Sequence, residues 1–302
     1  MKLRHILIPA SVLGFGVIVQ EAYAYVFRRN RPRLLAALLE TRGHADDYYT
    51  HRDTAAAALR ELPQERWTVR SSRGETLQGY YIPGAGNRKR VAFVVHGYRS
   101  DHADTAGMYY DFWRSRGFDL FCCDHAAHGA STGKYIGFSV FERDDCLLWL
   151  QELIGRLGPE IEIVLHGFSM GGATVLRMTD RLPPQVKFVI EDSGFASAEE
   201  QLRSMAGPAY SLLRLVNRYV ARYDLSDGDT APALQAARVP ILFVHGTEDT
   251  TVPYRNGPAL YEEYTGEKAC LFVPGAKHVE SFHVAPEAYA AAVDAMIDRH
   301  IQ

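Results

Sequence analysis

The sequence predicts an α/β protein with a mostly parallel sheet of eight strands and helices covering both faces. From about Arg66 onward, short apolar runs alternate with longer stretches of helical periodicity. Six of the runs are dense in β-branched and aromatic residues, which suits central strands buried on both faces. They are RVAFVV (90–95), FDLFCC (118–123), IEIVLH (161–166), VKFVIE (186–191), PILFVH (240–245) and ACLFVP (269–274).

Two more strands are expected upstream, where RWTVRS and TLQGYYIP alternate like a strand pair joined through the turn-rich SRGE. Helices are expected between the strands, at 105–116, 140–157, 170–181, 258–264 and 286–300. The sequence shows no internal repeat of solenoid period and no low-complexity tract.

Composition excludes several classes of protein. The 302 residues are enough for one large domain or two small ones. A formal net charge of -3 gives no electrostatic reason to expect nucleic acid as a partner. Four cysteines, at 122, 123, 146 and 270, have no metal-type spacing, and we interpret them as reduced core thiols.

The first 27 residues differ from the rest, since the chain is uncharged from Ile6 to Val19. One interpretation is a signal peptide cleaved after the A-x-A sequence that ends at Ala24. The other is an uncleaved membrane anchor from Ile6 to Phe27, about as long as the roughly 20 residues that a bilayer requires. The dense arginines behind it (RRNRPR) favour the anchor, so we expect a single N-terminal segment at a membrane. We expect residues 28–65 to be a connecting helical segment and 66–302 to form the main domain.

The stretch VLHGFSMGG (164–172) places a serine between a buried strand and a helix, with glycines at 167 and 171. G-x-S-x-G in this context predicts a nucleophile elbow, in which the serine lies at the tip of a strained turn. The glycines allow neighbouring backbone to come close to that turn. Ser169 is therefore the candidate nucleophile.

A serine nucleophile needs a base and an orienting acid, in the chain order Ser, acid, His. Asp249 follows the strand PILFVH in HGTEDTTVP, and His278 follows ACLFVP in PGAKHVES. Both loops are expected at the sheet edge that carries Ser169. Glu248 is the competing acid and His283 a competing base.

Three strands end in histidine and glycine, and a structural role in hydrogen bonding to backbone is the simpler interpretation for His96, His166 and His245. The loop HGYRSD follows the strand 90–95. An oxyanion would be held by the backbone N–H groups of Met170, next to the nucleophile, and of Tyr98 in that loop. The Tyr98 ring is a candidate wall of the acyl pocket.

The motifs HGY (96–98), DHAAHGAS (124–131), GFSMGG (167–172), HGTEDTTVP (245–253) and GAKHVES (275–281) resemble the α/β-hydrolase superfamily. The resemblance is closer to its bacterial branch of membrane-anchored hydrolases related to serine aminopeptidases and dienelactone hydrolases. It covers about Trp67 to the C-terminus. It implies the α/β-hydrolase fold and hydrolysis of esters, thioesters or amides. One loop departs from the usual D-x-R-G-H-G-x-S, because Ala126 and Ala127 replace Arg and Gly.

An insertion lies between Ser193 and Pro240, with helices expected near 198–205 and 209–223. Its apolar stripe suits a helix lying over a pocket, so we expect the segment at about 195–238 to be a short cap. Ordinary core packing is the alternative. The stripe consists of Leu212, Leu215, Val216 and Tyr219.

The sequence thus predicts a serine hydrolase that cleaves a carboxylic ester or thioester of a small-molecule substrate and needs no metal or organic cofactor. A peptidase acting on small or N-terminal peptides is the alternative, with the acidic pair Glu199-Glu200 available in the cap to hold an amino terminus. A non-catalytic binding protein that retains the fold is the alternative of another class.

Overall fold

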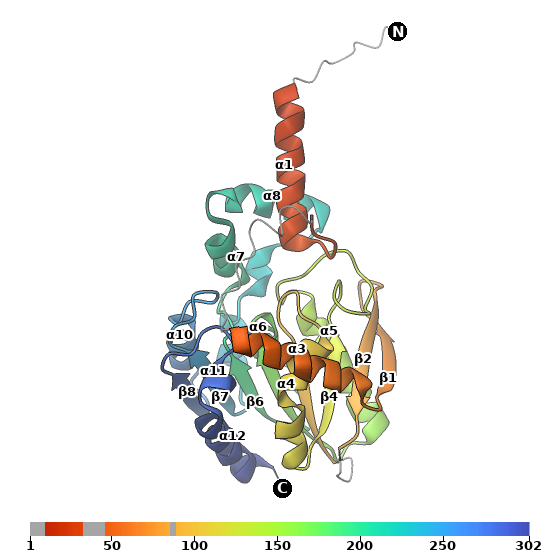
Figure 1. Ribbon diagram of the computed structural model, residues 1–302, viewed down its shortest axis with the longest axis vertical. Coiled ribbons are helices and arrows are strands. Elements are labelled where there is room, and N and C mark those ends of the chain that lie inside the picture. The colour runs from red at the N-terminus through yellow and green to blue at the C-terminus, as the bar shows by residue number, and fades with distance from the viewer. Residues whose placement is uncertain (1–9, 33–45, 85–88, 302) are drawn as a thin grey trace.

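The structure is a computed structural model, and it describes residues 10–32, 46–84 and 89–301. An eight-stranded sheet forms the centre, in the order β1-β2-β4-β3-β5-β6-β7-β8 (Figure 1). The strands β1 and β2 pair antiparallel, as do β2 and β4, and the remaining neighbours are parallel. The predicted fold class is confirmed. The strands are β1 (Glu65–Arg70), β2 (Thr76–Ile82), β3 (Arg90–Val95), β4 (Asp119–Asp124), β5 (Glu162–Phe168), β6 (Val186–Asp192), β7 (Ile241–Gly246) and β8 (Lys268–Val273).

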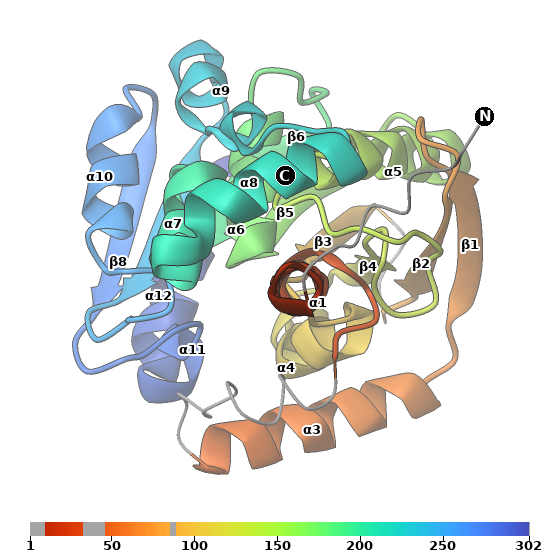
Figure 2. The same cartoon turned by 90° about the horizontal axis from the view of Figure 1, so that it is seen from above.

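Helices cover both faces of the sheet, and the five that the periodicity predicted are present within a few residues of the expected bounds (Figures 1 and 2). They are α4 (His102–Ser115), α5 (Glu142–Leu157), α6 (Met170–Met178), α10 (Asn256–Glu263) and α12 (Pro286–His300). Two short helices were not predicted from the sequence: α9 (Ala231–Ala236) and α11 (Ser281–Val284).

The strand β3 shows why the central runs are apolar at every position. Val91, Phe93 and Val95 belong to the core on one face of the sheet, and Ala92 and Val94 to the core on the other. Successive side chains of a strand point to opposite faces, so a strand covered by helices on both sides needs a continuous apolar run.

The last predicted strand is present, but the expectation that it is a central strand buried on both faces was wrong. β8 is an edge strand, paired only with β7 among the described strands, and most of its side chains are partly exposed. Cys270 is consequently an exposed free thiol, whereas Cys122, Cys123 and Cys146 are buried free thiols as expected. Aromatic and apolar composition does not distinguish an edge strand from a central one.

The N-terminal segment forms helix α1 (Ala10–Phe27), and part of it belongs to the folded core. Tyr23, Val26 and Phe27 are buried against the insertion and against Phe138. The N-terminal half of α1 projects beyond the rest of the protein (Figure 1). Within the described parts of the chain, no helix is both long and apolar enough to cross a membrane. The first residues of the expected anchor, 6–9, lie outside the described residues.

The connecting segment contributes helix α3 (Asp46–Glu61), which lies across α4 (Figure 2). The contact is close at Gly107, where an added Cβ would lie 2.7 Å from the backbone of Ala55. A glycine is therefore needed there for α3 to reach its place beside the sheet. The rest of the expected connecting segment, at 33–45, lies outside the described residues.

The insertion folds into helices α7 (Ala198–Ala206) and α8 (Tyr210–Val220) with the short α9, so both predicted helices are present. It packs against α1 and against Met170, beside the end of β5. The predicted apolar stripe of α8 does not lie over a pocket: Leu215 and Tyr219 are 53% and 75% exposed. The buried side chains of α8 are instead Tyr210, Leu213 and Asn217.

Candidate active site

Ser169 lies at a tight turn between β5 and α6. Its backbone has φ 55° and ψ -118°, a region that residues with a side chain rarely occupy. The flanking glycines make this turn possible, because a Cβ at Gly167 would lie 2.3 Å from the Gly171 carbonyl oxygen, and one at Gly171 would lie 2.1 Å from that of Val95. The turn is tied to the next strand by the Ser169 N–H, which donates to the Asp192 carbonyl at 2.9 Å.

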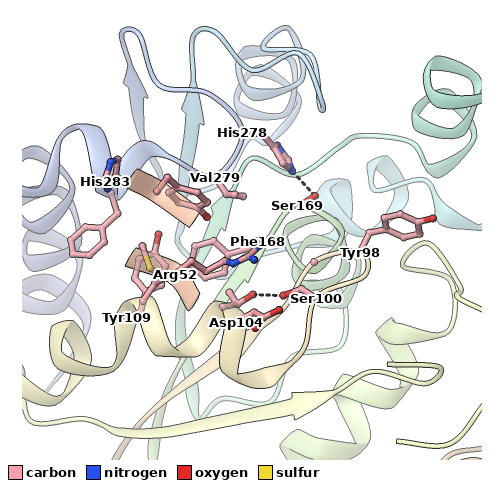
Figure 3. Close-up of a pocket in the computed structure, with 15 residues that line it drawn as sticks. Arg52, Tyr98, Ser100, Asp104, Tyr109, Phe168, Ser169, His278, Val279 and His283 are labelled. Atoms are coloured by element: carbon pink, nitrogen blue, oxygen red, sulfur yellow. Dashed lines mark hydrogen bonds between the residues drawn. The ribbon is translucent and has the colours of Figure 1, made fainter. Parts of the chain in front are cut away.

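The three residues of the predicted Ser, acid and His set meet at the carboxyl ends of the strands. His278 Nε2 is 2.9 Å from Ser169 Oγ, and His278 Nδ1 is 2.7 Å from Asp249 Oδ2 (Figure 3 shows the first contact). A carboxylate can only accept, so Nδ1 carries the proton and the neutral ring has Nε2 free to accept from the serine hydroxyl. The geometry is that of a serine activated by a base whose tautomer an acid fixes.

Asp249 is held in the charged form. Its burial acts to raise the pKa, but hydrogen bonds with His245 and His278 outweigh it and lower the pKa of the carboxyl well below its usual range. The other oxygen, Oδ1, accepts the backbone N–H groups of Thr251 and Val252 at 2.9 Å each. Both oxygens are thus fixed by named donors, which orients the carboxylate toward His278.

The competing acid and the competing base do not take part in the hydrogen bonds to Ser169, although His283 lines the same pocket. Glu248 is exposed, and its backbone N–H donates to the Ala276 carbonyl. His283 lies on α11 and its Nε2 contacts Asp47 at 3.2 Å. Among the described residues, neither side chain has a hydrogen bond to Ser169, whereas His278 has one.

The amides expected to hold an oxyanion flank Ser169. Met170 is the first residue of α6, so its N–H points out of the N-terminal turn of a helix. Tyr98 lines the pocket beside Ser169. Within the described residues, neither N–H donates to a protein acceptor. The Tyr98 ring, however, turns away from the pocket (Figure 3) and packs on Phe138 at 5.1 Å between ring centroids. It does not form the expected acyl wall.

The loop that carries Tyr98 is fixed by the end of α1, a contact that the sequence did not predict. The Tyr98 hydroxyl donates to the Val26 carbonyl at 2.8 Å. Arg99, in the left-handed region at φ 57°, donates to the Tyr98 hydroxyl at 2.9 Å and to the Arg28 carbonyl at 3.0 Å, and also to the carbonyl of Tyr25. A cation at the C-terminal end of a helix is favoured, because the last carbonyls lack partners within the helix.

A cluster of buried histidines supports the same loop from below. The Arg99 N–H donates to His128 Nε2 at 3.1 Å, and the His125 N–H donates to His96 Nε2 at 3.0 Å. Burial lowers the pKa of His128 to about 3 and also lowers the pKa of His96, so both rings are neutral at physiological pH and accept at Nε2. The motif histidines at 125 and 128 therefore have a structural part in the site.

Two of the three strand-end histidines, His96 and His245, have the backbone contacts expected of them, and His166 does not. His96 and His245 contact backbone carbonyls, of Gly97 at 2.7 Å and of Val252 at 3.0 Å. His166 contacts the Tyr289 hydroxyl at 2.7 Å instead of backbone. His245 Nε2 also lies 3.3 Å from Asp249 Oδ2, so it helps to position the acid as well.

The unusual loop DHAAHGAS is braced without an arginine of its own. Asp124 accepts from the His102 ring at 2.9 Å and from the Ala130 N–H at 2.7 Å. Arg29, behind α1, donates to the Gly129 carbonyl at 2.6 Å and to the Ser131 carbonyl. An arginine from the N-terminal segment thus braces the loop in which Ala126 and Ala127 replace the usual Arg and Gly.

A pocket of about 150 Å³ opens beside Ser169 and His278 (Figure 3). Its walls come from α3, α4, α11 and the ends of β3 and β5, and no residue of the insertion at 195–238 lines it. The expectation that the cap roofs this pocket is therefore wrong. The other lining residues are Tyr48, Arg52, Gly97, Tyr98, Ser100, Asp104, Thr105, Met108, Tyr109, Phe168, Val279, Phe282 and His283.

One further cluster has residue types that can hold a metal. Cys123, His125 and Cys146 are all buried, and their ligand atoms lie within 4.8 Å of one another. His125 Nδ1 has no hydrogen-bond partner among the described residues. Two thiolates and an imidazole suit a soft ion such as zinc. The sequence did not predict this group, because the positions of Cys123, His125 and Cys146 along the chain do not form a known metal-binding spacing.

Comparison with known proteins agrees with this fold. A sequence model of the family described as "Serine aminopeptidase, S33" matches residues 86–234. The human "Alpha/beta hydrolase domain-containing protein 17B" is 24% identical over 216 residues, which are 71% of this chain and 69% of that protein. In sequence the chain resembles proteins of the α/β-hydrolase superfamily.

Two other relatives show how far the likeness extends. The uncharacterized protein YqkD of Bacillus subtilis is 23% identical over 250 residues, 80% of this chain and 81% of that protein. The solved structure of the Pyrococcus furiosus esterase Pf2001 superposes with a TM-score of 0.64 at 19% identity, over 80% of this chain and 94% of that one. These likenesses support hydrolysis as the activity of this chain. The bond that it cleaves is not decided by the likeness.

Proposed function

We propose that the protein is a serine esterase that acts through an acyl-enzyme. The observation that carries the proposal is the unbroken chain of hydrogen bonds from Asp249 through His278 to Ser169, at 2.7 and 2.9 Å. A non-catalytic member of the fold would have no need for a strained serine at hydrogen-bond distance from a base.

In the proposed reaction, Ser169 Oγ attacks the ester carbonyl carbon while His278 Nε2 takes the hydroxyl proton. The N–H groups of Tyr98 and Met170 hold the oxyanion of the tetrahedral intermediate. His278 then gives its proton to the leaving alcohol as the bond to the acyl carbon breaks. Water then attacks the acyl carbon while His278 takes its proton. The resulting tetrahedral intermediate breaks its bond to Ser169 Oγ, which takes the proton back from His278, and the acid is released.

The pocket supports a small, mostly apolar acyl group. Tyr109, Phe168 and Phe282 supply aromatic walls, and Met108 and Val279 supply aliphatic ones. A volume of about 150 Å³ is enough for a short aliphatic chain or one aromatic ring. We therefore favour esters or thioesters of short-chain or aromatic acids.

The structure gives the peptidase alternative less support. Glu199 and Glu200, the pair that was available to hold an amino terminus, line a separate surface depression with Arg203. Glu199 is also engaged by Arg203 and Arg214, at 3.0 and 3.4 Å. Its charge is thus already paired, and it does not line the pocket at Ser169.

We also propose that the N-terminal segment is retained and attaches the enzyme to a membrane. The A-x-A sequence lies within helix α1, and its Tyr23 is buried with its hydroxyl 3.2 Å from Asn217 Oδ1. Cleavage after Ala24 would remove that contact. A retained segment would leave the projecting half of α1 to enter the bilayer.

The reaction is tested with a fluorophosphonate probe and p-nitrophenyl esters of graded chain length, beside aminoacyl-p-nitroanilides. Ser169→Ala should abolish labelling and reduce turnover on the order of 10⁶-fold, as in comparable serine enzymes. Ser204→Ala, on the exposed surface of α7, is the matched control and should leave both unchanged. More than a few per cent residual turnover in Ser169→Ala would show that another residue is the nucleophile, and faster anilide than ester hydrolysis would favour the peptidase.

A further inference from the structure

Helix α8 carries more apolar side chains than the protein covers. Tyr210 and Leu213 face inward and belong to the core that the insertion shares with α1. Leu212, Leu215 and Tyr219, three and four residues apart along another face, are 36%, 53% and 75% exposed. Helices of soluble proteins normally turn such a stripe toward a core. Packing among the described residues does not explain the exposed face of α8, meaning these three side chains.

The exposed face of α8 belongs to a larger group of exposed apolar side chains. Large apolar side chains that are exposed gather on α1, α7 and α8, with Val284 as the exception in the described part of the chain. On α1 these are Val17 and Ile18, 59% and 67% exposed, in the half that projects from the molecule (Figure 1). Met205 and Val220 add to it near the ends of α7 and α8. A concentration of this kind marks an interaction surface.

The two helices have the mutual orientation that a bilayer surface requires. Viewed from above, α1 is seen end-on while α8 lies across the view, so the two axes are roughly perpendicular (Figure 2). Both lie at the same end of the molecule (Figure 1). A bilayer would accept the projecting part of α1 along its normal and α8 flat in the interface plane.

The charges beside this face favour lipid over a protein partner. Arg218 lies on α8 and the exposed Arg222 follows just after it, whereas Arg214 of the same helix is already paired with Glu199 and Asp224, at 3.4 and 3.1 Å. The Arg218 side chain is 69% exposed and only 3.5 Å from its acidic partner, Asp224. Arginines that border an exposed apolar stripe are typical of helices that lie on anionic lipid, where each basic group near the surface adds to the attraction.

We propose that the exposed face of α8 docks onto the surface of an anionic lipid bilayer and forms a second membrane contact beside α1. The three apolar side chains enter the boundary between headgroups and acyl chains, and Arg218 and Arg222 contact lipid phosphates. The proposal extends the attachment that we proposed for the N-terminal segment. It does not depend on the proposed reaction at Ser169.

Tryptophan quenching by brominated lipids tests this directly, with the full chain bound to vesicles of phosphatidylglycerol and phosphatidylcholine. The three native tryptophans are at most 4% exposed and provide a low, constant background. Tyr219→Trp should be quenched several-fold more than wild type by acyl-chain bromines. The matched control is Glu160→Trp, at an exposed position just before the amino end of β5, and its fluorescence should not be quenched.

A charge-introducing variant gives the second readout. Leu215→Asp combined with Tyr219→Asp should weaken binding to anionic vesicles at least tenfold and leave the melting temperature unchanged, because both side chains are exposed. Hydrolysis of a soluble p-nitrophenyl ester should be unaffected, and this separates failure of the docking proposal from failure of the proposed function.

Three outcomes would overturn the proposal. Vesicle-bound Tyr219→Trp that is not quenched would mean that α1 alone holds the protein and α8 remains in water. Equal binding to purely zwitterionic vesicles would remove the role of the arginines. Self-association in solution that the double aspartate variant abolishes, without quenching on vesicles, would identify a second copy of the chain as the occupant of the face.

Discussion

Replacing Asp249 by Asn should reverse the tautomer of His278. Oδ1 of Asp249 accepts two backbone N–H groups at 2.9 Å, from Thr251 and Val252, so the amide oxygen of the Asn variant would remain at that position. Its NH₂ group then replaces Oδ2, which lies 2.7 Å from His278 Nδ1. Two donors cannot face each other, so Nδ1 must become the acceptor and Nε2 must carry the proton. In that state Nε2 cannot accept the proton of Ser169.

The alternative amide orientation is the costlier one. It would point the NH₂ group at two N–H donors and lose two hydrogen bonds, each contributing about 1 kcal/mol. The wrong tautomer also leaves the imidazolium of the transition state without its counter-charge. Loss of the equivalent acid in a serine protease costs about 10⁴ in turnover. At roughly 1.4 kcal/mol per factor of ten, we expect Asp249→Asn to raise the barrier by about 5.5 kcal/mol.

The assay is kcat/KM on a p-nitrophenyl ester together with the rate of fluorophosphonate labelling, and both should fall to a similar extent. Glu248→Gln is the matched control: it is the adjacent carboxyl, it is exposed, and it should retain wild-type rates. If Asp249→Asn kept a tenth of the activity, or Glu248→Gln were the damaging change, the assignment of the acid would be wrong.

Two other changes have expected outcomes. Arg99→Met should lower kcat about tenfold or more with little effect on folding, because it releases the Tyr98 loop, and complete loss of an oxyanion donor costs about 10²–10³ in kcat. The control is Arg114→Met at an exposed position. Equal kcat in the two variants would contradict the role of Arg99. Glu191→Gln should raise the melting temperature relative to wild type at pH 8 but not at pH 5. Burial raises the pKa of Glu191 from 4.5 to about 7, so the wild-type carboxyl contributes its full stability below about pH 4.5 and loses it as the pH rises through 7. A difference in melting temperature that is the same at both pH values would refute this account.

The sheet could be predicted because its strands are buried on both faces. In β3, alternate residues such as Phe93 and Val94 enter different cores, and only a continuous apolar run satisfies both. The order of Ser169, Asp249 and His278 could be predicted for a related reason: loops that follow parallel strands meet at one edge of the sheet. The structure brings these three together.

Other features depend on contacts that no local pattern records. Arg99 contacts the carbonyl of Arg28 across 71 positions of sequence, and nothing in HGYRSD indicates a partner in the N-terminal segment. The contribution of α3 to the pocket through Tyr48 and Arg52 was missed for the same reason. On α8 the pattern correctly predicted an apolar face, but periodicity says nothing about what covers it. Leu213 faces a core and Leu215 faces solvent on one helix.

The end of α1 links the proposed membrane contact to the proposed chemistry. Its carbonyls at Tyr25 and Val26 accept from Arg99 and from the Tyr98 hydroxyl, and the N–H of Tyr98 is the one assigned to the oxyanion. On its other side, α1 places Phe27 in the core that the insertion shares with Met170, the second oxyanion residue. Tyr98 therefore lies in a loop that the end of α1 holds, and Met170 lies in the core to which Phe27 of α1 belongs. An N-terminal segment that was only a leader would have no reason to support the catalytic loop, whereas a retained segment that seats the enzyme on lipid would also hold its oxyanion site in place.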